Sequence, residues 1–201
     1  MQLHSHNSVA VLTFPPGAGY PRLTRALLKE LRTLLDDVRG AGLFHGAVIA
    51  ANAGSFATGA AVEEVAAVEG VEARQFAEMG QAVFNHIANF PLPVVAAIRG
   101  YCLGGGLDLA LACHGRVATY DATFGHPGPL LGLITGWGGT QRLARLAGNS
   151  AALQILLTAD RIPATQALTL GLVDELVSSK DLVEVAARRC AALAARCGGS
   201  H

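Results

Sequence analysis

Hydrophobic and polar residues follow one another along the chain in blocks that predict strands and helices in turn. Five short apolar stretches, each ended by glycine, proline or polar residues, are predicted as strands: 8–14, 46–52, 94–98, 116–120 and 173–177. Between and after them, apolar residues at three- and four-residue spacing predict helices over 23–38, 71–90, 107–113, 140–146, 150–158, 163–170 and 181–196. Strands that alternate with helices are typical of an α/β fold with a parallel sheet.

The chain is long enough for one substantial hydrophobic core and too short for two comfortable domains. It has 201 residues, of which 51% are hydrophobic and 15% charged, as expected of a folded protein and not of a disordered one. No internal repeat or linker interrupts the sequence. We therefore predict a single domain over residues 1–201.

Charge and hydropathy exclude two classes of partner. The 15 Lys and Arg residues balance the 15 Asp and Glu residues, so no broad basic surface is available for nucleic acid or for anionic lipid. Every apolar stretch is interrupted by glycine, proline or a charged residue before it reaches the length of a membrane span. We expect neither a nucleic acid nor a membrane as partner.

The cysteine and histidine patterns bear on metal binding and on the cellular compartment. Cys102, Cys113, Cys190 and Cys197 lack the paired spacing of a zinc site, and the seven histidines are scattered. We therefore expect free thiols in a reducing compartment and no metal ion. The first twenty residues lack the basic region and long apolar run of a secretory signal. These features predict a cytoplasmic protein.

Two glycine-rich turns, at 54–59 and 104–106, each come after a predicted buried strand. The first has the spacing of a phosphate-binding loop, but Ala60 and Ala61 stand where that loop needs Lys and Ser or Thr. Neither turn completes a GxGxxG motif, and no GxSxG nucleophile motif is found in the sequence. Such turns often serve as simple connectors. After neighbouring parallel strands, however, they can also direct one backbone N–H each at the same oxygen atom.

Residues 94–113 (VVAAIRGYCLGGGLDLALAC) closely resemble the signature segment of the crotonase superfamily, the enoyl-CoA hydratase/isomerase family. The likeness continues at 55–60 (SFATGA), 122–127 (ATFGHP), 136–143 (GWGGTQRL) and 171–173 (GLV). It implies a ClpP/crotonase-type α/β fold with a ββα spiral core, a parallel sheet and packed helices. It also implies an acyl-CoA thioester as substrate, with no cofactor besides the coenzyme A that the substrate carries.

The resemblance also assigns roles to residues. Family enzymes polarise the thioester carbonyl with two backbone N–H groups, the oxyanion hole, and so stabilise an enolate. These donors fall on Ala60 and Gly105. The substrate-binding residues that the resemblance implies are Ala57, Thr58, Gly59, Ala60, Gly104 and Gly105. Because the donors belong to the backbone, the side chain at Ala60 matters little, whereas a branched side chain at Gly105 is expected to block the site.

The acid–base groups depart from the family pattern. One of the two hydratase glutamates is replaced by Asp108, which lies three residues after Gly105 and so on nearly the same helix face. Asp108 is a candidate catalytic residue; its alternative role is to complement the helix dipole. The second glutamate falls on Gly128, and the acid of other family branches falls on Gly136, so both are absent. His126 is a candidate substitute near neutral pH, or else a packing residue of its loop.

These departures leave two functions open. A single acid/base favours an isomerase, or a weak hydratase, that acts through an enolate. The missing acids favour instead a catalytically degenerate acyl-CoA-binding protein or a structural subunit of a larger assembly. Family members also continue beyond the position of His201 into a C-terminal helical layer. We expect that layer to be truncated, the apolar surface beneath it to be covered by helix 181–196 or another subunit, and a homo-oligomer, a trimer or a hexamer, to form.

Overall fold

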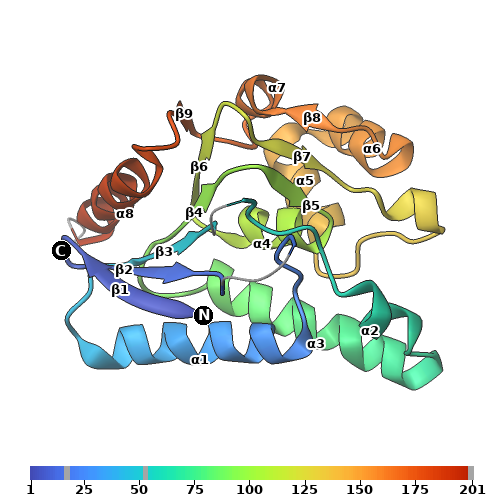
Figure 1. Cartoon of the computed structure of the whole chain (residues 1–201), viewed down its shortest axis with the longest axis horizontal. Coiled ribbons are helices and arrows are strands. Elements are labelled where there is room, and N and C mark those ends of the chain that lie inside the picture. Colours follow the sequence, from blue (N-terminus) through green and yellow to red (C-terminus); the bar gives the residue numbers. More distant parts are fainter. Residues whose placement is uncertain (16–18, 52–53, 199–201) are drawn as a thin grey trace.

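The computed structural model describes residues 1–15, 19–51 and 54–198, which form a layered α/β structure (Figure 1). The strands are β1 (Gln2–His6), β2 (Val9–Thr13), β3 (Ala47–Ala50), β4 (Val94–Ile98), β5 (Tyr101–Leu103), β6 (Gly115–Thr119), β7 (Thr123–Gly125), β8 (Ile162–Pro163) and β9 (Glu175–Val177). The helices are α1 (Arg25–Ala41), α2 (Val62–Ala66), α3 (Gly70–Ala88), α4 (Gly105–Ala112), the 3₁₀ helix η1 (Gly128–Leu131), α5 (Gly139–Ala147), α6 (Asn149–Thr158), α7 (Ala164–Thr169) and α8 (Leu182–Gly198).

The strands form two sheets. The main sheet has the order β1-β2-β3-β4-β6-β9, in which β2 to β9 are paired in parallel and β1 is antiparallel to β2. The smaller sheet has the order β5-β7-β8, with β8 antiparallel to β7. The predicted α/β class, with a parallel sheet and packed helices, is confirmed.

The central strands are buried on both faces of the main sheet. On β3, Ala47 and Ile49 belong to the larger core with residues of α1, α3 and α4, whereas Val48 and Ala50 belong to a second core with residues of α8. Successive side chains of a strand point to opposite faces. Because both faces are covered, the strands are continuous apolar runs instead of alternating ones.

Helix α8 covers the second face of the main sheet. Its residues Leu182, Val185, Ala186 and Cys190 are buried in the second core, and the helix contacts β2, β3, β4 and β6. Figure 1 shows α8 on the opposite side of these strands from α1 and α3. Helix α8 therefore covers the apolar residues on this face of the sheet.

The ends of α1 follow from two residues. The Thr24 side chain accepts a hydrogen bond from the backbone N–H of Leu27 (3.1 Å), which satisfies one of the free amides at the start of the helix. At the other end Gly42 adopts the left-handed conformation, with φ of 63°, and closes the helix. Local sequence therefore fixes both boundaries of this helix.

The hydrophobic pattern did not predict β1, α2 or the smaller sheet. β1 is missed because its sequence, QLHSH, is polar and exposed; it pairs with β2 through a turn at Asn7 and Ser8, which both have positive φ. The strands of the smaller sheet have two or three residues each, too few to show a period. Across the described residues, no helix is long and apolar enough to cross a bilayer, and no three His, Cys, Asp or Glu side chains are grouped to hold a metal ion.

Candidate active site

The two glycine-rich turns lie against each other. Ala57 and Cys102 form a parallel bridge, and the backbone N–H of Leu103 donates to the carbonyl of Ala57 (2.9 Å). Gly106 permits this approach, because a Cβ atom there would lie 2.3 Å from the Ala57 carbonyl oxygen. The main chain thus brings residues 57–60 and 103–106, which are far apart in the sequence, to one place.

The backbone amides of Ala60 and Gly105 are neighbours. A Cβ atom on Gly105 would lie 3.4 Å from the amide nitrogen of Ala60, and one on Gly59 would lie 3.4 Å from the amide nitrogen of Gly105. Within the described parts of the chain, neither amide donates a hydrogen bond to a protein acceptor. Gly105 is the first residue of α4, whose N-terminal amides have no partner within the helix. Two neighbouring free N–H groups, one of them at a helix start, can donate to an anionic oxygen.

The other predicted substrate-binding residues hold these turns in place. Thr58 donates its backbone N–H to the carbonyl of Pro21 (2.9 Å), and the Gly59 carbonyl accepts from Leu23 (2.8 Å). On the second turn, the backbone N–H of Gly104 donates to the Gly125 carbonyl (2.9 Å), and its φ of 53° is one that glycine adopts readily. Segments before α1 and around β7 therefore anchor the two turns.

Asp108 lies on the first turn of α4 and is fully buried. The Thr135 hydroxyl donates a hydrogen bond to its Oδ2. Burial raises the pKa of Asp108 to about 6; the Thr135 hydrogen bond, the Arg142 guanidinium and the backbone amides of Trp137 and Gly139 act in the opposite direction. At pH 7 the carboxyl group is mostly ionised, yet near enough to its pKa to accept and release a proton.

His126 lies beside Asp108. Its Nε2 is 3.3 Å from Asp108 Oδ1, and only 3% of the His126 surface is exposed. The contact lacks hydrogen-bond geometry, and neither atom has another hydrogen-bond partner among the described residues. Burial lowers the pKa of His126 to about 4, so the ring is neutral at pH 7. The structure therefore brings together the two side chains named as acid/base candidates.

Trp137, in the loop before α5, lies between the Gly105 turn and helix α3. A Cβ atom on Gly105 would lie 2.6 Å from Cζ3 of the Trp137 ring, so the ring lies directly against the turn. The ring packs on Phe76 and Phe84 of α3, and the side chain is buried. Trp137 thus forms the wall behind the Gly105 amide.

Sequence reasoning missed Thr135 and Gly139. Thr135 lies in the glycine-rich loop before α5, where the hydrophobic pattern gives no signal for a side chain that contacts α4. Gly139 is required because a Cβ atom there would lie 1.9 Å from Asp108 Oδ1. The glycine pair at 138–139, directly before a predicted helix, was the one available signal of a close approach.

The two vacated acid positions differ in their surroundings. A Cβ atom on Gly128 would lie 2.7 Å from the backbone oxygen of Leu133, which leaves no room for a side chain. A Cβ atom on Gly136 would meet only the Ala77 Cβ, at 3.7 Å, an ordinary contact. Loop 128–136 is therefore closed to an acid at the first position and open to one at the second.

Comparisons with known proteins agree with this architecture. The model of the enoyl-CoA hydratase/isomerase family matches residues 4–198. An enoyl-CoA hydratase from Bacillus anthracis has 30% sequence identity and a TM-score of 0.87, with 98% of this chain and 76% of that one covered. DspI from Pseudomonas aeruginosa also has 30% identity and a TM-score of 0.87, over 100% of this chain and 80% of that one.

A third solved structure, an enoyl-CoA hydratase/carnitine racemase from Magnetospirillum magneticum, has 26% identity and a TM-score of 0.88 over 95% of this chain and 74% of that one. The family model covers nearly the whole chain, and these structures share its fold throughout. The expected crotonase-type fold is thereby confirmed. This chain belongs to the enoyl-CoA hydratase/isomerase family.

Proposed function

We propose that this protein is an acyl-CoA thioester enzyme that stabilises an enolate in an oxyanion hole, of the enoyl-CoA isomerase or weak hydratase type. The observation that carries the proposal is the pair of neighbouring, unpartnered amides of Ala60 and Gly105. Free N–H groups that are fixed by the main chain stabilise negative charge as it develops on a carbonyl oxygen, and one such donor is typically worth about 10²–10³ in rate.

The proton chemistry falls to Asp108. Its carboxylate takes a proton from the α-carbon of the bound acyl group, and the electron pair moves through the carbonyl carbon to the oxygen held by the two amides. The same carboxyl group then returns the proton to the γ-carbon, which moves the double bond without changing the composition of the substrate. A carboxyl whose pKa is about 6 suits both directions of transfer.

Isomerisation needs one acid/base, and this site supplies one carboxylate. Hydration needs a second group to activate water, and the two positions where family members carry it are Gly128 and Gly136. His126, neutral at pH 7, is the remaining group that faces the Asp108 carboxyl. Because its pKa is about 4, His126 is a weak base at pH 7 and would activate water poorly, so we expect isomerase activity to exceed hydratase activity.

The second candidate is a catalytically degenerate acyl-CoA-binding protein or a structural subunit. It is favoured by one observation: the Asp108 side chain is fully buried beneath loop 132–138, whose Thr135 already occupies one carboxylate oxygen. A substrate that cannot reach this carboxyl would be bound and not turned over.

A panel of 2-enoyl-CoA and 3-enoyl-CoA esters of different lengths tests both candidates. The native protein, Asp108→Asn and a control variant, Asp121→Asn, are compared; Asp121 is exposed in the turn after β6. The enzyme proposal is supported if the native protein and the control isomerise the esters while Asp108→Asn binds them and does not. Calorimetric binding of esters with no turnover by any of the three proteins supports the degenerate candidate. Absence of both binding and turnover contradicts both.

We further propose that the protein acts in the cytoplasm as a homotrimer or hexamer. The support is the family membership together with large apolar side chains exposed on η1, α6 and the loop after η1, among them Leu130, Ile134, Leu153 and Leu157. Light scattering on the purified chain measures the mass of the assembly directly, and a monomer at micromolar concentration contradicts this part of the proposal.

A further inference from the structure

A groove between α8 and β9 has no part in the proposed chemistry. It has a volume of about 280 Å³ and lies beside the main sheet on the face that α8 covers, opposite to α4. Its lining residues come from one edge strand and one helix: Glu175, Arg188, Arg189, Ala192, Leu193 and Arg196. Half of these side chains are arginines, in a chain whose net charge is zero.

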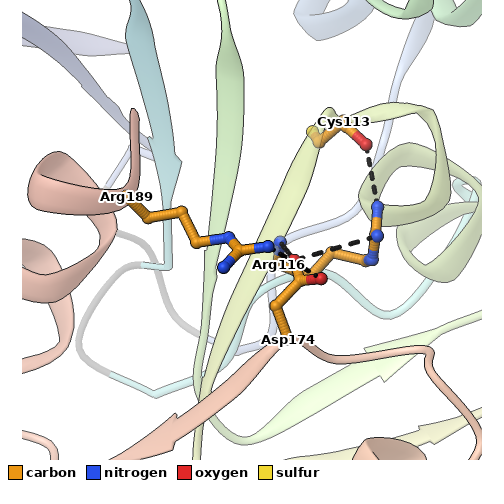
Figure 2. Close-up of polar contacts among 4 residues, drawn as sticks. All are labelled: Cys113, Arg116, Asp174 and Arg189. Atoms are coloured by element: carbon orange, nitrogen blue, oxygen red, sulfur yellow. Dashed lines mark hydrogen bonds and ion pairs between the residues drawn. The ribbon is translucent and has the colours of Figure 1, made fainter. Parts of the chain in front are cut away.

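Arg189, one of the lining residues, also belongs to a cluster of charges behind the groove. Figure 2 shows Asp174 between Arg116 and Arg189. The Asp174 carboxylate lies 3.1 Å from Arg189 Nη2 and 3.8 Å from Arg116 Nη2, and it accepts a hydrogen bond from the backbone N–H of Arg116 (2.7 Å). Arg116 is buried and also donates to the Cys113 carbonyl (2.8 Å). This cluster holds Arg189 in a defined position at the groove.

Several donors of this cluster have no acceptor. The Nε atom of Arg189, which lines the groove, is buried without a hydrogen-bond partner among the described residues. The Nε atom of Arg116 is also unpartnered there, but Arg116 does not line the groove. Arg188 has a long contact with Glu175, at 3.5 Å, and both side chains are largely exposed. Arg196, about two turns further along α8, has no ion pair within the described parts of the chain. A buried guanidinium N–H without an acceptor is costly, and an anion would satisfy it.

The charges do not balance within the groove. Three guanidinium groups, those of Arg188, Arg189 and Arg196, line the groove with one carboxylate, that of Glu175, which leaves an excess of two positive charges among the lining residues. The Asp174 carboxylate behind Arg189 is shared with Arg116. Guanidinium groups present planar pairs of donors that match the oxygens of a phosphate group. The volume lies just below the usual range of ligand pockets, about 300–1,000 Å³, which suits a small anion and not a whole nucleotide.

From this juxtaposition we infer that the groove between α8 and β9 binds a phosphate group, as the free ion or as a small phosphate ester. Arg189, held by Asp174, forms the fixed side of the site, and Arg188 and Arg196 close on the ligand from α8. Because the groove and α4 lie on opposite faces of the main sheet, this site is separate from the proposed oxyanion hole and does not depend on it.

Thermal unfolding and calorimetry with inorganic phosphate and with glycerol 3-phosphate test the inference, at an ionic strength kept constant with sodium chloride. The test variant is Arg188→Gln with Arg196→Gln. The matched control is Arg32→Gln with Arg145→Gln, which removes two exposed arginines from α1 and α5. Both variants lose the same charge, so a difference between them reflects the site and not the net charge of the protein.

We expect a saturable rise in melting temperature with phosphate for the native protein and the control, and a dissociation constant at least about tenfold weaker for the test variant, since two charge-assisted contacts are lost. Tighter binding of glycerol 3-phosphate assigns the ligand as an ester; tighter binding of inorganic phosphate assigns it as the free ion. Equal binding by all three proteins, or a rise that sodium chloride reproduces, overturns the inference. Acyl-CoA turnover is measured in parallel and is expected to be unchanged in the test variant, which separates failure of this site from failure of the proposed function.

Discussion

The Nε2 atom of His126 lies 3.3 Å from Oδ1 of Asp108, and both side chains are buried. Burial disfavours the charged form of each group, so it raises the pKa of the acid and lowers the pKa of the base. Near neutral pH the pair is therefore an ionised carboxylate next to a neutral imidazole. Both residues change protonation at a pH that differs from their unperturbed values, and the pair thereby links stability and activity to pH.

The first prediction concerns the pH dependence of stability. Folding moves the pKa of Asp108 from 3.8 up to about 6, so its contribution to the free energy of unfolding decreases as pH rises between these values. Folding moves the pKa of His126 from 6.5 down to about 4, so its contribution increases over nearly the same range. In the native protein the two slopes largely cancel.

Single variants uncover each slope. Between pH 4 and 6 the unfolding free energy of His126→Gln should fall by about 3 kcal/mol relative to that of the native protein, because only the Asp108 slope remains. Over the same range the unfolding free energy of Asp108→Asn should rise by a similar amount, because only the His126 slope remains. Urea denaturation at a series of pH values measures both. Three parallel curves would mean that the two groups are not buried as described.

The second prediction concerns Thr135, whose hydroxyl donates to Asp108. The hydrogen bond favours the ionised carboxylate, so Thr135→Val should raise the pKa of Asp108 further above 6 and move the acid limb of the kcat profile to higher pH by about one unit. Thr165→Val, at an exposed position of α7, is the control. A profile that does not move would show that Asp108 does not govern the rate.

The third prediction concerns Gly105. In Gly105→Val the Cβ atom would meet the Trp137 ring at 2.6 Å, so we expect the amide to be displaced, acyl-CoA binding to be lost and stability to decrease by about 1–3 kcal/mol. Gly40→Ala is the control, because no atom lies within 4 Å of the added Cβ inside α1; it should retain binding and gain about 0.5–1 kcal/mol. Calorimetry with an acyl-CoA ester measures binding, and native affinity in Gly105→Val would rule out a role for that amide.

The fourth prediction separates the two vacated acid positions. Gly128→Glu should destabilise the protein by about 1–3 kcal/mol, because its Cβ would lie 2.7 Å from the Leu133 backbone oxygen. Gly136→Glu should change stability by less than about 1 kcal/mol, since its Cβ meets only Ala77 at 3.7 Å. We therefore expect only Gly136→Glu to fold as the native chain does and to increase turnover of an enoyl-CoA. Equal stability of the two variants contradicts this reading of the loop.

Much of the fold follows from local sequence. The apolar run at 94–98 coincides with β4, and the helical periods at 71–90 and 150–158 lie within two residues of α3 and α6 at either end. These elements are predictable because burial on a sheet or a helix face imposes a period on the sequence itself. β1 and the smaller sheet were not predictable, because pairing with distant strands, and not a local pattern, creates them.

The same division holds for the site. The glycines after two strands, and an acid three residues after Gly105, were predictable from the sequence. Close backbone approach requires glycine, and helix geometry fixes which residues share a face. That the Ala60 and Gly105 amides are neighbours, and that Thr135 and His126 flank Asp108, depends on segments that meet only when the chain packs.

The cluster of Arg116, Asp174 and Arg189 likewise joins residues that are up to 73 positions apart, on β6, before β9 and on α8. Sequence by itself determined which backbone conformations and faces are available; tertiary packing decided which groups lie within reach of one another, because desolvation and contact act only on groups that the fold has brought together.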